Sequence, residues 1–153
     1  MASILETYGT DMKPKFIDYY MKIAEVTSGL SYAKRLQVGA VIVKGNQIIG
    51  TGYNGMPTGW ENVCETVEID GSTKTKPEVL HAETNAIAKV SQSTESSEGA
   101  TLFCTHAPCM ECAKLIYQSG INSVYYRDTY RDDSGLNFLK LSGVHVHQFT
   151  NSI

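Results

Sequence analysis

The chain of 153 residues is 42% hydrophobic and 19% charged, which fits one globular domain, and we expect a single domain over residues 1–153. Its net charge of −3 excludes the broad basic field that a long nucleic acid selects. The sequence has neither an apolar run of about 18 residues nor a secretory signal at its start, so we expect a cytoplasmic protein without a membrane anchor.

The N-terminal third predicts a helix followed by a β-hairpin. Apolar residues recur at helical spacing over 14–26, and Ser28-Gly29 is a helix-ending signal. Residues 38–43 are apolar and rich in β-branched side chains, and Gly45-Asn46 forms a turn into a second strand over 47–53.

The rest of the chain begins with an irregular segment and then alternates between helices and strands. Residues 54–79 are polar and broken by Gly and Pro, and we expect a long loop that is functional or mobile. The later elements are a helix over 81–90, a loop over 91–99, a strand over 100–104, a helix over 108–118, a strand over 123–126, a helix near 136–141 and a strand over 144–149. This order predicts an α/β fold with a central mixed sheet covered by helices.

The four cysteines are better suited to metal binding or burial than to disulfides, because a cytosolic chain of this size does not need such cross-links. Cys104 lies in an apolar strand pattern and is expected to be buried. Cys109 and Cys112 are three residues apart at the start of a predicted helix, so both thiols face the same way and can share one metal. Pro108 suits the first turn of that helix, whose dipole favours thiolates.

A CxxC pair alone fits either a dithiol redox motif or half of a structural zinc site, so further ligands must decide. His81 and Glu83 begin another predicted helix, and their two-residue spacing sends the side chains in different directions. This arrangement favours His81 as a ligand and Glu83 as a group beside an open position. Three protein ligands are typical of catalytic zinc and four of structural zinc. The count favours catalysis, unless Cys64 or another residue is a fourth ligand.

The segments His81-Ala82-Glu83 and Pro108-Cys109-Met110-Glu111-Cys112 together resemble the HxE…PCxxC signature of the zinc-dependent nucleobase deaminases. Residues 52–59 (GYNGMPTG) are similar to a loop of the deoxycytidylate deaminase family. Other segments similar to that family, in the same order, are 38–40, 81–87 and 111–121. The resemblance covers most of residues 30–147 and implies a three-layer α/β/α cytidine deaminase-like fold with a central mixed five-stranded sheet.

The resemblance implies conversion of dCMP to dUMP, a supply for thymidylate synthesis, with Zn²⁺ held by His81, Cys109 and Cys112. Glu83 is expected to take a proton from the zinc-activated water and to deliver it to the cytosine ring and the departing amine. Thr84 departs from the family, in which Leu is common at this position. We expect this change to alter the packing behind Glu83 without touching the ligands.

The 5′-phosphate of a nucleotide requires a local positive group in a chain of negative net charge. Arg35 is the first candidate, and Lys34 and Arg131 are the alternatives, although each also suits a solvated surface position. The resemblance also implies that Asn54 contacts the sugar or an effector and that Ala82 presents a backbone group to the base.

Tyr130 is a candidate for stacking on the base, with packing as the alternative. The resemblance further implies a homohexamer regulated by dCTP and dTTP, with Mg²⁺ accompanying the triphosphate. Tyr53, Asn54 and Gly55 are the expected effector residues, in a loop that continues to Gly59.

Other classes of protein share parts of this pattern. The zinc signature also occurs in deaminases of free cytidine and tRNA adenosine, against which the GYNG loop argues, and dCTP remains a possible substrate. A zinc-stabilised binding module has the same ligands without turnover. A redox protein has the CxxC pair without zinc.

Overall fold

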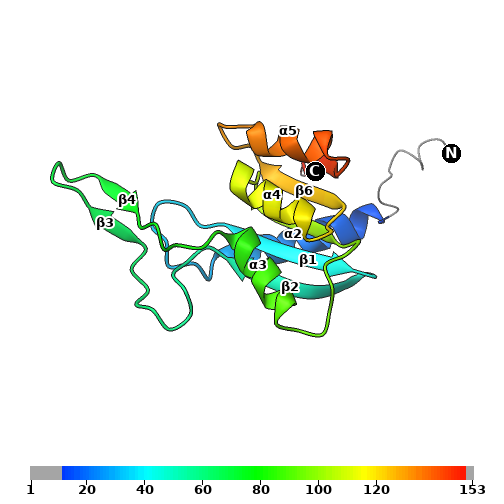
Figure 1. The fold of residues 1–153 in the computed structure, drawn as a ribbon, viewed down its shortest axis with the longest axis horizontal. Helices are drawn as coiled ribbons and strands as arrows, with labels where there is room; N and C mark the ends of the chain where they lie inside the picture. The colour runs from blue at the N-terminus through cyan, green and yellow to red at the C-terminus, as the bar shows by residue number, and fades with distance from the viewer. Residues whose placement is uncertain (1–11, 151–153) are drawn as a thin grey trace.

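The computed structural model describes residues 12–150 and has the expected elements in the expected order, with two additional strands between the first hairpin and the second helix (Figure 1). The helices are α2 (Pro14–Ser28), α3 (Ala82–Ser91), α4 (Met110–Gln118) and α5 (Ser134–Leu141). The strands are β1 (Gly39–Lys44), β2 (Gln47–Tyr53), β3 (Glu65–Val67), β4 (Thr73–Thr75), β5 (Thr101–His106), β6 (Ser123–Asp128) and β7 (His145–Gln148). The predicted hairpin, helices and later strands are therefore present, with ends shifted by a few residues.

The main sheet has five strands in the order β2-β1-β5-β6-β7. β1 is antiparallel to both β2 and β5, whereas β5, β6 and β7 run parallel to one another. The sheet is thus mixed, as expected. The parallel pair β5 and β6 ends at His106 and Asp128, and the loops that follow these two residues begin at the same edge of the sheet.

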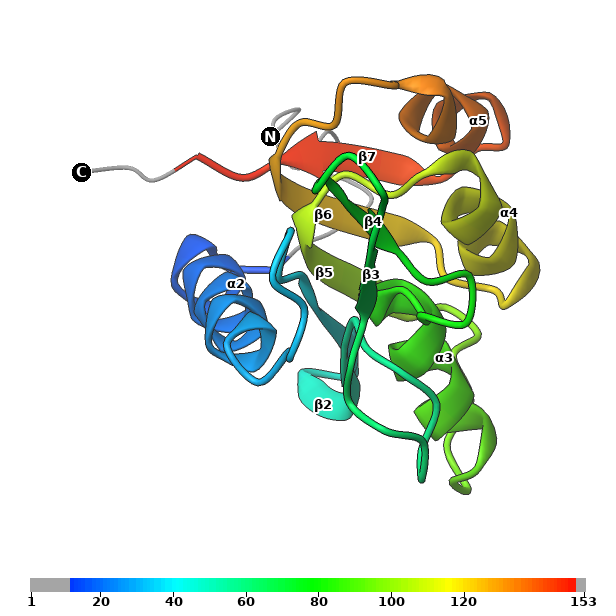
Figure 2. The ribbon, with the colours of Figure 1, turned by 90° about the vertical axis from the view of Figure 1, so that its left-hand side faces the viewer.

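Helices cover both faces of this sheet and complete the three layers (Figure 2). Alternate side chains of β1 point to opposite faces. Val41 and Val43 pack with α2, whereas Ala40 and Ile42 belong to the core formed with α3, α4 and α5. Two buried clusters therefore hold the sheet from its two sides, and the expected three-layer α/β/α architecture with a mixed five-stranded sheet is confirmed.

The prediction of an irregular segment over 54–79 is wrong in part, because that segment contains a second, two-stranded sheet. β3 and β4 pair antiparallel, with Glu65 opposite Thr75, and the connecting turn has Gly71 at a φ of +88°. The Asp70-Gly71 dipeptide is a recognised hairpin signal. This β3–β4 hairpin projects from the main sheet (Figure 1), and its base borders the site described below.

Two close backbone approaches fix the helices that begin near the site. A Cβ atom at Gly52 of β2 would overlap the Ala82 carbonyl oxygen and lie 2.5 Å from the Ala86 nitrogen, so α3 lies directly on this strand. A Cβ atom at Gly135 of α5 would lie 2.8 Å from the Cys109 carbonyl oxygen. Only a residue without a side chain permits such contacts.

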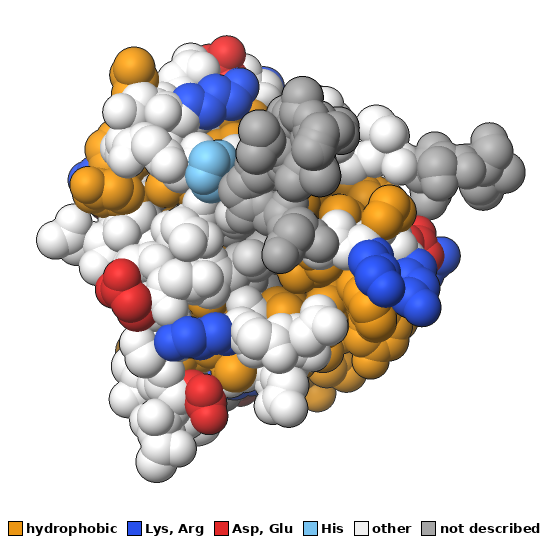
Figure 3. All heavy atoms as spheres, turned by 90° about the vertical axis from the view of Figure 1, so that its right-hand side faces the viewer, with side chains coloured by type: hydrophobic (Ala, Val, Ile, Leu, Met, Phe, Trp, Pro, Cys, Tyr) orange, Lys and Arg blue, Asp and Glu red, His pale blue; other side chains and the backbone are white. Residues whose placement is uncertain are grey.

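Within residues 12–150, no helix combines the length and apolar character required to cross a membrane. Figure 3 shows the face opposite the β3–β4 hairpin, where Lys and Arg side chains lie in separate groups with Asp and Glu among them. The described part of that face therefore has no continuous basic surface.

Candidate active site

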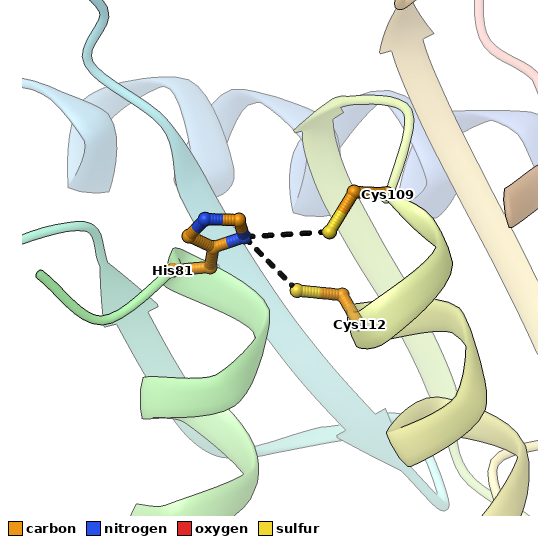
Figure 4. Close-up of side chains that lie close together, drawn as sticks. All are labelled: His81, Cys109 and Cys112. Carbon is orange, nitrogen blue, oxygen red and sulfur yellow. Dashed lines mark hydrogen bonds between the residues drawn. The ribbon is translucent and has the colours of Figure 1, made fainter. Parts of the chain in front are cut away.

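Three potential metal ligands converge between the starts of α3 and α4 (Figure 4). The Nδ1 atom of His81 lies 3.2 Å from the Cys112 sulfur and 3.6 Å from the Cys109 sulfur. The ligand atoms all lie within 4.8 Å of one another. Tetrahedral zinc with ordinary bond lengths separates nitrogen and sulfur ligands by about 3.6 Å. The donor set and its spacing therefore fit one Zn²⁺ ion, and Cys64 lies outside this group.

Local helix structure explains why these side chains are available. His81 is the N-cap of α3 and Cys109 the N-cap of α4, and neither side chain makes a capping hydrogen bond. Pro108 therefore precedes the cap and is not in the first turn, contrary to the sequence-based expectation. Hydrogen bonds with Cys112 and His81 lower the pKa of the Cys109 thiol well below its ordinary value. The Cys109 thiolate is the form that binds a metal.

Glu83 lies in the first turn of α3 with only 4% of its surface exposed. Burial raises the pKa of its carboxyl group to about 7, against an ordinary value of 4.5. A group with a pKa near neutrality can both accept and donate a proton under physiological conditions. The position and the pKa therefore suit an acid–base group beside the three ligands.

Thr84 contacts the ligand set, which corrects the expectation that it would not. Its hydroxyl oxygen lies 3.7 Å from the Cys112 sulfur, within hydrogen-bonding distance of a sulfur atom. A hydroxyl donor at this position stabilises a thiolate. The departure from Leu thus adds a polar contact directly behind a ligand.

A pocket of about 720 Å³ opens beside the ligands, and its volume lies within the usual range for small-molecule sites. The structure brings six of the residues named from the sequence into its lining in addition to the ligands His81 and Cys109: Arg35, Asn54, Ala82, Glu83, Tyr130 and Arg131. Lys34, Tyr53 and Gly55 are not part of this lining. The pocket therefore joins the metal cluster to cationic and aromatic side chains from distant parts of the chain.

The three residues of the expected effector loop make different contacts. The Asn54 side chain accepts a hydrogen bond from the Val38 N–H and donates one to the Leu36 carbonyl. The Lys89 ammonium nitrogen lies over the Tyr53 ring, 5.6 Å from the ring centroid. Gly55 exchanges backbone hydrogen bonds with Leu80, the residue before His81. This loop is consequently tied both to the pocket wall and to the start of α3.

Sequence reasoning missed some residues of the pocket. Glu65 and Thr75 enter the lining from the base of the β3–β4 hairpin, for which the Asp70-Gly71 turn was the available signal. His106 is a different case, because its place close to Cys109 and Cys112 in the sequence allows a pocket position while favouring a supporting or loop role. It lines the pocket, where its Nε2 lies 3.6 Å from the Asp128 carboxylate. Burial lowers the pKa of His106, so the ring is neutral near pH 7.

Comparison with known proteins gives the family. Residues 14–128 match the family model described as the cytidine and deoxycytidylate deaminase zinc-binding region. The chain belongs to this family. The matched span includes both ligand-bearing segments, so the zinc site is a property of the family to which this chain belongs.

Relatives of this deaminase-family chain include deoxycytidylate deaminases and solved structures. It is 38% identical to the deoxycytidylate deaminase of Mus musculus over 146 residues, covering 87% of this chain and 79% of that protein. It is 35% identical to the deoxycytidylate deaminase of Saccharomyces cerevisiae, covering 91% of this chain but only 46% of that protein. The chain thus spans about half the length of the yeast relative.

A dCMP deaminase from the cyanophage S-TIM5, solved in complex with dCMP and dUMP, has a closely similar fold. It superposes with a TM-score of 0.84 at 47% identity, covering 90% of this chain and 99% of the phage chain. Nearly the whole phage enzyme therefore has a counterpart in this chain.

Removal of any one ligand is expected to remove the metal. His81→Ala, Cys109→Ala and Cys112→Ala each delete one of three ligands, and purified protein should contain well below one zinc per chain, measured by atomic emission. Cys64→Ala is the matched control because it deletes a buried thiol outside the cluster, and it should retain zinc. Full zinc content in a ligand variant would remove that residue from the set.

The raised pKa of Glu83 predicts a pH-dependent stability of the metal-free chain. Because the folded chain binds this proton more tightly than the unfolded chain, its contribution to stability is complete below pH 4.5 and is lost as the pH rises through about 7. The difference between the unfolding free energies of the wild type and Glu83→Gln should change by about 3 kcal/mol, to the disadvantage of the wild type, as the pH rises from 4.5 to 8.

Urea unfolding at several pH values measures this difference. Glu111→Gln is the control, because it removes a carboxylate that is 81% exposed from the first turn of α4. A difference between wild type and Glu83→Gln that is independent of pH would contradict the assigned pKa.

Proposed function

We propose that the chain is a deoxycytidylate deaminase, which converts dCMP and water to dUMP and ammonia and so supplies dUMP for thymidylate synthesis. The observation that carries this proposal is the buried Glu83 carboxyl group beside the His81, Cys109 and Cys112 cluster in a pocket of nucleotide size. Its similarity to deoxycytidylate deaminases, including one solved with dCMP and dUMP, supports the choice of substrate.

The proposed chemistry uses three ligands and one proton carrier. Zinc, when held by His81, Cys109 and Cys112, supplies the Lewis acidity that activates water as a nucleophile. Glu83 accepts the proton that this water loses. As the water oxygen bonds to C4, Glu83 passes this proton to N3 of the cytosine ring. It then takes the remaining proton of the new C4 hydroxyl group and passes it to the amino group, so that the C4–N bond breaks, ammonia leaves and a C4 carbonyl remains.

Other pocket residues position the nucleotide in this proposal. Ala82 presents its backbone to the base, and Tyr130, which is 41% exposed and lines the pocket, stacks on the base. Asn54 holds the wall beside the sugar through its hydrogen bonds to Leu36 and Val38. Arg35 supplies the positive charge for the phosphate.

Regulation by dCTP and dTTP, with Mg²⁺ accompanying the triphosphate, is part of the same proposal. Tyr53, Asn54 and Gly55 are the proposed effector residues. The backbone pairing of Gly55 with Leu80 supports this assignment, because it links the loop to the residue that precedes His81. We further propose a cytoplasmic homohexamer with one catalytic domain per chain.

A panel of substrates with and without effectors tests both parts of the proposal. Deamination of dCMP should exceed that of deoxycytidine, cytidine, dCTP and a tRNA carrying the target adenosine. With Mg²⁺, dCTP should raise the apparent affinity for dCMP by about 5- to 150-fold, and dTTP should lower it. Sedimentation in the same buffers reports the oligomer.

The outcomes separate the alternatives. Preference for another member of the panel would replace the proposed substrate, and bound zinc without any turnover would indicate a binding module. A monomer with hyperbolic, effector-independent dCMP curves would contradict the regulatory part and leave the deaminase chemistry intact.

A further inference from the structure

The loop over residues 31–38 forms a rigid, cationic side of the pocket. The Ser31 hydroxyl donates a hydrogen bond to the Asn54 carbonyl and accepts one from the Ala33 N–H. The Asn54 side chain holds the far end of the loop at Leu36 and Val38. Contacts at both ends therefore fix the backbone between them before any ligand binds.

Within this loop, two successive backbone donors converge on one oxygen atom. The N–H groups of Lys34 and Arg35 donate hydrogen bonds to the same Glu65 carboxylate oxygen, at 2.9 and 3.2 Å. Successive N–H groups that point to a common centre form an anion-binding nest. Here the nest, defined by these two N–H groups, contains the carboxylate of a residue at the base of the β3–β4 hairpin.

The charges around the nest are not balanced within the described chain. Across residues 12–150, the side chains of Lys34, Arg35 and Arg131 take part in no ion pair, and the Glu65 carboxylate interacts with the backbone of the loop. Arg35, Arg131 and Glu65 all line the same pocket as Glu83. Such a cluster is suited to an anion with more charge and more acceptor oxygens than one carboxylate has.

We propose that the Lys34–Arg35 nest is the binding site for the nucleotide 5′-phosphate and that the Glu65 carboxylate occupies this site until the phosphate displaces it. This inference rests on the proposed function, because it assumes a nucleotide monophosphate in the pocket. A phosphate monoester carries a charge of about −1.5 to −2 and three terminal oxygens. It can therefore bind the N–H groups and the cationic side chains together, which the carboxylate does not.

Because the Glu65 carboxylate competes for the N–H groups of Lys34 and Arg35, only a ligand that carries a phosphate group can replace it in the nest. A nucleoside has no anion with which to replace the carboxylate, so its binding does not gain these hydrogen bonds. A nucleotide gains the hydrogen bonds of the nest only after it displaces Glu65. The free energy of the displaced Glu65 contact is therefore subtracted from the binding free energy of the nucleotide. Removal of the Glu65 charge should therefore strengthen the binding of phosphate compounds selectively.

Calorimetric titration of the zinc-loaded protein with deoxyribose 5-phosphate measures this effect. Glu65→Gln should bind this probe about three- to tenfold more tightly than the wild type, the effect of removing one competing, partly exposed charge. Arg35→Gln should bind it more weakly. Because the probe carries no base, the result is independent of whether the chain deaminates dCMP.

Glu68→Gln is the matched control, because it removes one carboxylate charge from the same hairpin. Glu68 is exposed, and its side chain contacts Thr66. The affinity of Glu68→Gln for the probe should equal that of the wild type. Equal or weaker binding of deoxyribose 5-phosphate by Glu65→Gln, or equal gains in both variants, would overturn the proposal. Absence of binding to either protein would overturn it as well.

Discussion

The structure depends on the meeting of two helix N-termini whose cap positions are occupied by two members of the candidate metal cluster. Ser, Thr, Asp or Asn at an N-cap stabilises a helix by about 1 kcal/mol relative to a residue that does not cap. His81 and Cys109 occupy these positions without making capping hydrogen bonds. Both helices therefore lack that stabilisation, and the ligand atoms remain free to bind a shared ion.

Electrostatics favour this arrangement once the ligands are ionised. The positive ends of the α3 and α4 dipoles stabilise negative charge at Cys109 and Cys112. A bound cation in turn holds the two N-termini together, so metal binding contributes to folding as well as to chemistry. The close approaches at Gly52 and Gly135 supply the geometry, because they hold α3 against β2 and the Cys109 backbone against α5.

Local patterns in the sequence were sufficient for most of the fold and for the ligand cluster. The β-branched run of β1 and the Gly45-Asn46 turn specified the first hairpin, since both signals act over a few residues. The spacings of His81 with Glu83 and of Cys109 with Cys112 placed these groups at helix starts. The β3–β4 hairpin was missed because its strands are only three residues long and mostly exposed, so they carry little hydrophobic pattern.

The side of the pocket that carries Arg35 and Glu65 could not be predicted in detail. The contact between Glu65 and the Lys34 backbone spans 31 residues, and no local pattern encodes it. Arg35 was recognised by charge, whereas the backbone donors beside it became apparent only from the folded geometry. The side chains that form a metal cluster have characteristic types and spacings, but a backbone nest can be built from almost any residues.

The central claim is that Glu83 transfers protons during deamination without contributing to metal binding, and the Glu83→Gln variant tests it most directly. Zinc content and steady-state turnover of dCMP should be measured on the same purified sample, together with dUMP binding as a check on the pocket. We predict that Glu83→Gln has the same zinc content and the same dUMP affinity as the wild type. Its kcat should be lower by a factor of at least about one hundred. A kcat near that of the wild type would contradict the account, as would loss of zinc in this variant.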